Sequence, residues 1–79
     1  MKVGLYSYVE NYVDMFELGD DGKFMFSIDP GSIFLVIGEE MYIEKSTGKH
    51  VQNLIMLANG VVGSTASHWS KRSEFKRVM

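Results

Sequence analysis

The apolar positions of this chain fall into short runs separated by turn residues, a pattern typical of strands. The clearest run covers residues 54–57 and leads through Ala58 into Asn59-Gly60 and then Val61-Val62. Asn-Gly between apolar flanks is a strong hairpin signal, because a type I′ turn needs positive φ at both central residues. The sequence therefore predicts a β-hairpin within residues 51–65.

The two-residue turn also predicts the pairing of this hairpin. Across such a loop Ala58 faces Val61, Leu57 faces Val62 and Met56 faces Gly63. Both faces of the hairpin are then apolar, one carrying Leu54, Met56, Ala58 and Val61 and the other Ile55, Leu57 and Val62. We expect the domain core to cover one face, and either residues 1–28 or a second copy of the chain to cover the other.

Further strands are predicted wherever β-branched and aromatic residues cluster between turn signals. They cover residues 3–8, 23–28, 32–37, 41–45 and 51–57, with a short last strand anchored by Phe75 and Val78. Pro30-Gly31 fits a type II turn. The run SIFLVI at 32–37 lacks alternation and predicts a strand buried on both faces, followed by a solvated loop at Glu39-Glu40.

Residues 9–18 fit two structures. A capping-box spacing between Ser7 and Glu10 favours a short helix over 8–18, as does the apolar spacing of Val9, Tyr12, Val13 and Phe16. The turn-forming segment 19–22 instead favours a β-hairpin of about 12–18 with 23–28. We favour the hairpin, because helices shorter than ~12–15 residues are marginal without packing.

Composition narrows the class of protein. The 79 residues make one small domain, and 46% apolar content is enough for a folded core. The chain has no cysteine, which excludes disulfides and thiolate metal sites and favours a reducing, cytoplasmic setting. No run approaches the roughly 20 apolar residues of a membrane helix, so we expect no membrane association.

The net charge of −2 conceals an asymmetry along the chain. Residues 1–44 carry nine acidic and two basic residues, whereas residues 45–79 carry six basic residues and one acidic residue. One interpretation is that the two halves pack together and their surface charges attract weakly. The other is a dipolar molecule that offers an acidic face to one partner and a basic face to another.

From residue 29 onward the order of elements follows a familiar pattern. PGSIFLVIGEE gives a Pro-Gly turn, an apolar strand and an acidic loop, and IMLANGVVG gives a strand and a tight hairpin before a short last strand. This resembles the small SH3-like barrel proteins encoded by tailed bacteriophages. The resemblance implies a mainly β barrel of about five strands over residues 29–79, with residues 1–28 as an N-terminal extension packed on it within one domain.

The best candidate binding site combines an aromatic residue with nearby cations in the C-terminal segment. Its members are Trp69, Lys71, Arg72, Lys76 and Arg77. Cations beside an aromatic ring suit phosphate contacts and base stacking in a nucleic-acid complex. The alternative is that Trp69 closes the open barrel end while the cations are solvated. The equivalent segment of peptide-binding SH3 domains carries a proline, which residues 66–69 lack, so binding of proline-rich peptides is not expected.

No catalytic or metal-binding pattern emerges. The carboxylates at Asp20-Asp21 and Glu39-Glu40 match no calcium loop, and two histidines without cysteine make a poor zinc site. Ser67 and Ser70 flank His68, but no carboxylate completes a nucleophile–base arrangement. Phosphate-binding glycine motifs are also absent. We therefore expect no enzyme activity, no metal and no cofactor.

The resulting hypothesis is a non-enzymatic binding module. It is expected to be a phage accessory protein that engages a host or virion protein in the host cytoplasm, and to self-associate through apolar strand faces or edges. The alternative hypothesis is a nucleic-acid-binding protein that uses Trp69 and the basic C-terminal tail.

Overall fold

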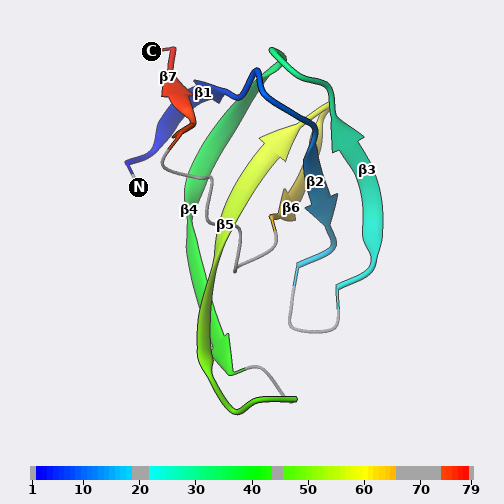
Figure 1. The fold of residues 1–79 in the computed structure, drawn as a ribbon, viewed down its shortest axis with the longest axis vertical. Coiled ribbons are helices and arrows are strands. Elements are labelled where there is room, and N and C mark those ends of the chain that lie inside the picture. Colours follow the sequence, from blue (N-terminus) through cyan, green and yellow to red (C-terminus); the bar gives the residue numbers. More distant parts are fainter. Residues whose placement is uncertain (1, 19–21, 44–45, 66–73, 79) are drawn as a thin grey trace.

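The computed structural model describes residues 2–18, 22–43, 46–65 and 74–78, which form one antiparallel β-sheet and no α-helix. The seven strands run in the spatial order β3-β2-β6-β5-β4-β1-β7 (Figure 1). Their bounds are β1 Gly4–Ser7, β2 Val13–Phe16, β3 Phe24–Ile28, β4 Ile33–Ile43, β5 His50–Ala58, β6 Val61–Ser64 and β7 Lys76–Arg77.

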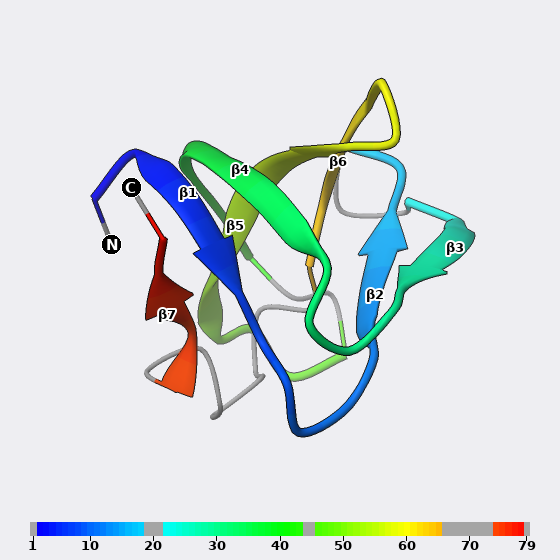
Figure 2. The ribbon, with the colours of Figure 1, turned by 90° about the horizontal axis from the view of Figure 1, so that it is seen from above.

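The sheet curls strongly, and β3 and β7 lie at its two ends (Figure 2). These two strands do not pair with each other, so the sheet does not close. The mainly β class is therefore confirmed, but a small SH3-like barrel is not. Residues 1–28 supply three strands to this same sheet, with β1 between β4 and β7 and β2 beside β6.

The predicted hairpin at Asn59-Gly60 is confirmed in both conformation and register. Asn59 has a φ of 52° and Gly60 a φ of 75°, as the type I′ turn requires. The pairs Ala58–Val61, Leu57–Val62 and Met56–Gly63 join β5 to β6.

The ambiguous N-terminal segment forms the hairpin and not the helix. Strands β2 and β3 pair antiparallel from Val13–Ile28 to Phe16–Phe24, with a bulge before the last pair. The predicted turn at Pro30-Gly31 is also present, since the Ser32 amide donates to the Asp29 carbonyl at 3.0 Å and Gly31 has a φ of 83°.

Strand β4 corrects the prediction of a loop at Glu39-Glu40. It runs without interruption for 11 residues, and Glu39 and Glu40 pair with Leu54 and Asn53 of β5. The register shifts between Val36 and Gly38, which marks a bulge. Here the backbone pairing of β4 with β5 outweighs the low strand propensity of the two glutamates.

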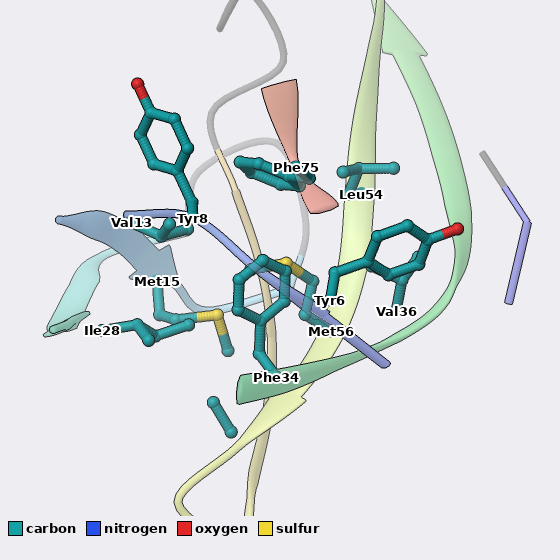
Figure 3. Close-up of a cluster of buried hydrophobic side chains, with 11 residues drawn as sticks. Tyr6, Tyr8, Val13, Met15, Ile28, Phe34, Val36, Leu54, Met56 and Phe75 are labelled. Carbon is teal, nitrogen blue, oxygen red and sulfur yellow. The ribbon is translucent and has the colours of Figure 1, made fainter. Parts of the chain in front are cut away.

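The core lies inside the curl of the sheet (Figure 3). It is built from all parts of the chain and comprises Tyr6, Tyr8, Val13, Met15, Ile28, Phe34, Val36, Leu54, Met56, Ala58 and Phe75. The rings of Phe34 and Phe75 meet edge to face with their centres 5.1 Å apart, and the ring centres of Tyr8 and Phe75 are 5.5 Å apart. The strands contribute alternate residues to this core. They are Tyr6 from β1, Phe34 and Val36 from β4, and Leu54, Met56 and Ala58 from β5.

The C-terminal strand is anchored differently from the prediction. Phe75 is buried as expected, at 7% exposure, but the side chain of Val78 is exposed. Val78 contributes its backbone instead, because its amide donates to the Leu5 carbonyl at 2.7 Å.

Candidate protein-binding face

The side of the sheet that faces away from the core carries a row of aliphatic side chains. Leu5 pairs with Leu35, Leu35 with Leu57, and Leu57 with Val62, so the row crosses β1, β4, β5 and β6. Residues directly opposite each other in an antiparallel pair project from the same face. The row is therefore continuous across four strands.

A second row runs beside the first and extends to the β3 end of the sheet. Ile55 pairs with Ser64, Ser64 with Phe16, and Phe16 with Phe24. Ser64 is polar and only 1% exposed, so the apolar surface of this row is interrupted at β6. The rings of Phe16 and Phe24 meet edge to face at 5.8 Å. We call the two rows together with their β4 neighbours the outer face, which comprises Leu5, Phe16, Phe24, Ile33, Leu35, Ile37, Ile55, Leu57 and Val62.

The outer face is substantially open to solvent. Ile33 is 54% exposed, Ile37 41% and Val62 46%, while Leu35 and Leu57 are half-buried. The prediction that residues 32–37 are buried on both faces is therefore wrong for the described chain. Residues 1–28 do not lie over this face as a layer, because their strands enter the sheet itself. The apolar run predicted burial on both faces of the strand, but no described element packs over the outer face.

A polar pair stands at one end of this arrangement. Glu40 and Asn53 face each other on β4 and β5. Glu40 Oε2 and Asn53 Oδ1 are both buried, and within the described part of the chain neither has a hydrogen-bond partner. Asn53 is only 4% exposed. A buried acceptor without a donor costs about 1–3 kcal/mol, so this pair is a weak point of the β4–β5 ladder.

The charge asymmetry of the sequence becomes a partial separation across the sheet, since Lys23 lies beside Phe24 at the acidic end and Glu74 lies just before β7 at the basic end. The exposed residues Lys76 and Arg77 form β7 at one edge. Near the other edge, Asp14 and Glu17 lie on and just after β2, and Asp29 follows β3. Ser27 on β3 donates a hydrogen bond to Asp14 Oδ1 at 2.7 Å. The described residues thus place acidic groups beside the aromatic end of the outer face.

The predicted nucleic-acid site is described only in part. Trp69, Lys71 and Arg72 lie outside the described residues, while Lys76 and Arg77 form β7. The Arg77 guanidinium lies 5.8 Å from the centre of the Tyr6 ring and donates to Tyr6 Oη at 3.4 Å. It also donates to the carbonyl of Val3 at 3.1 Å. Arg77 therefore ties β7 to β1, and a phosphate would have to compete with these contacts.

The residues considered for catalysis or metal binding do not assemble. His50 is exposed at the start of β5, and His68, Ser67 and Ser70 lie outside the described residues, as do Asp20 and Asp21. Ranges 2–18, 22–43, 46–65 and 74–78 contain no cluster of three or more groups that could hold a metal ion. They also contain no helix that could span a membrane.

Comparison with known proteins adds no family. A scan against protein-family models, a search of curated proteins and a search of solved structures find no significant match to this chain. The outer face is therefore the feature on which a functional proposal rests.

Proposed function

We propose that this protein is a non-enzymatic binding module that engages a protein partner through its outer face. The observation that carries the proposal is the exposure of Val62 in the first apolar row and of the neighbouring β4 residues Ile33 and Ile37. Scattered exposed aliphatic residues are ordinary, but contiguous apolar patches on small proteins mark interaction sites.

The surroundings of the outer face indicate what kind of partner it fits. Protein interfaces combine a desolvated apolar centre with a polar, charged rim. Here the rim near the aromatic end carries Asp14 and Glu17, both exposed. The matching partner is a protein with an aliphatic or aromatic patch bordered by lysine or arginine on the side that meets β2. Opposite rim charges would speed association and fix its orientation more than they would strengthen it.

A second part of the proposal concerns the type of fold and the cellular location of the protein. We propose, on the resemblance over residues 29–79 alone, that the chain is a phage accessory protein with a small SH3-like barrel and that it binds a host or virion protein in the host cytoplasm. The strongly curled antiparallel sheet and the type I′ hairpin are compatible with it. A fold of this kind does not select a function by itself, so the outer face remains its main support.

A matched pair of substitutions tests the proposal. Val62→Glu places a charge in the first apolar row, where the valine is 46% exposed, and Val9→Glu places the same charge at a valine outside the sheet that is 59% exposed. Wild type and Val9→Glu should retain the same partner from extract of the host cell, and Val62→Glu should lose it. Circular dichroism verifies that both variants are folded. Equal retention of the partner by Val62→Glu would contradict the proposal.

The β7 edge favours nucleic-acid binding as a second candidate. Lys76 and Arg77 are adjacent and exposed there. Binding of a fluorescent single-stranded oligonucleotide should weaken steeply with salt if these cations contact phosphates. Replacing Lys71, Arg72, Lys76 and Arg77 by alanine should then abolish it, whereas Lys23→Ala and Lys49→Ala should not. Binding that survives the fourfold replacement would remove this candidate.

A further inference from the structure

Strand β3 is an unprotected edge of the sheet. It pairs with β2 on one side only, and no other described element lies beyond it in either view (Figures 1 and 2). Its five residues, FMFSI, include no charge and no proline. Natural edge strands usually carry such residues, because an open row of N–H and C=O groups is a template for another strand. The bulge in the β2–β3 ladder puts one irregularity at the Phe24 end of β3, while residues 26–28 keep a regular ladder. Edge β3 therefore retains the capacity to pair.

The residues that flank β3 indicate which strand would fit. Lys23 precedes the strand and Asp29 follows it, and both are exposed. If a second β3 lies antiparallel to the first with Phe26 opposite Phe26, then residue 24 faces residue 28 and Lys23 faces Asp29 of the second copy. The same happens at the other end of the strand. Two opposite-charge pairs thus bracket the apolar pairing.

Other arrangements lose this match. A parallel pairing in register would set Lys23 beside Lys23 and Asp29 beside Asp29, and like charges directly opposite are destabilising. An antiparallel shift by two residues would leave both charges without an opposite partner. The flanking charges therefore select one orientation and one register, which is how a self-complementary two-fold interface is specified.

We propose that the protein forms a two-fold dimer in which the β3 edges of two copies pair antiparallel about Phe26 and extend the sheet from one molecule into the other. The new strand also shields Phe24, which is 57% exposed at the end of this edge. This inference goes beyond the proposed function, because the outer face, apart from Phe24 at its β3 end, remains open in such a dimer and available to a different partner.

Charge reversal tests the dimer with an internal rescue. Sedimentation velocity over a concentration series measures the dimer dissociation constant of wild type. Lys23→Glu should raise this constant about tenfold, because two attractive pairs become repulsive. Asp29→Lys should do the same, and combining the two substitutions should restore the wild-type value. Lys49→Glu makes the same charge change in the β4–β5 connection and should leave the constant unchanged.

Hydrogen exchange locates the interface independently of any substitution. Raising the protein concentration should slow exchange of the amides of residues 24–28 and leave those of β7 unaffected. Protection at the outer face without protection of β3 would overturn the proposal, as would a monomer at every concentration up to about 1 mM. So would a double charge swap that fails to restore association. Val62→Glu should leave the dimer intact, so failure of the outer-face proposal and failure of this one give different results.

Discussion

The two ends of the sheet are built in opposite ways. Strand β7 has two residues, both charged and exposed, whereas β3 has five residues without a charge. A short, cationic edge resists pairing with another chain, while a longer apolar edge invites it. One curled sheet thus has one blocked edge and one receptive edge, and only the receptive edge has flanking residues of opposite charge.

The two ends are also held to the molecule by different forces. Two residue pairs join β7 to β1, so its attachment depends on the side chains of Phe75 and Arg77. Strand β3 is held mainly by its ladder with β2 and by Met25 and Phe26, which pack against the core. The blocked edge therefore depends mainly on side-chain packing, and the receptive edge depends on backbone pairing together with the packing of Ile28, Met25 and Phe26.

The largest effect is expected at the blocked edge. Phe75→Ala should lower the free energy of unfolding by about 3–4 kcal/mol, because it removes a buried ring that contacts Phe34 and Tyr8. Phe24→Ala removes the same side chain from an exposed position at the other edge and should cost less than about 1 kcal/mol. Urea denaturation compares the two, and equal losses would mean that Phe75 does not anchor β7.

The junction between the receptive end and the rest of the sheet depends on Gly63. A Cβ there would lie 2.6 Å from the Phe16 carbonyl oxygen and 2.7 Å from the Met25 Cε. Gly63→Ala should therefore cost about 1–3 kcal/mol by separating β6 from β2. Gly38→Ala is the control, because a Cβ at that strand position meets nothing within 4 Å. A neutral Gly63→Ala in chemical denaturation would show that β2 approaches β6 less closely.

Arg77 and Lys76 are expected to differ in how much they contribute to the stability of the blocked edge. Arg77→Ala should lower the free energy of unfolding by about 1 kcal/mol, since it loses contacts with Tyr6 and the Val3 carbonyl. Lys76→Ala, on the same strand, should change it by less than about 0.5 kcal/mol. Thermal unfolding of the two variants at one salt concentration distinguishes them, and an equal response would assign Arg77 no fixing role.

The smallest effect on stability is expected where the receptive edge is made to resemble the blocked one. Phe24→Lys should change the free energy of unfolding by less than about 1 kcal/mol, because the side chain is already largely exposed. It should nevertheless raise the dimer dissociation constant, since an edge lysine opposes pairing. If light scattering finds dimerisation unchanged, the contrast between the two edges has no consequence for association.

The sequence predicted those features that depend on neighbouring residues better than those that depend on residues far apart in the chain. The hairpin at Asn59-Gly60 and the turn at Pro30-Gly31 were predictable because their φ requirements are local. The insertion of β1 between β4 and β7 was not, because strand order depends on pairings between residues far apart in the chain. The loop predicted at Glu39-Glu40 failed for the same reason, since β5 imposes a strand there.

The candidate face was foreseen in part. The sequence indicated that Leu57 and Val62 lie on a second apolar surface, and the structure adds Leu5 and Leu35 to that row. The aromatic continuation through Phe16 and Phe24 was not predicted, because it depends on the single pair that joins Phe16 to Ser64. Within one strand, alternation reveals which residues share a face, but it does not reveal which strand lies alongside.

The β2–β3 hairpin has a dynamic consequence that follows from how it is attached. The Gly31 amide donates to the Tyr8 carbonyl at 2.8 Å, so the chain leaves and returns at nearly the same point. Between these points, one residue pair joins the hairpin to β6. Such a segment forms a closed loop of chain that opens as a unit, at the cost of exposing Val13, Met15 and Ile28. We expect its amides to exchange together, before those of β4 and β5.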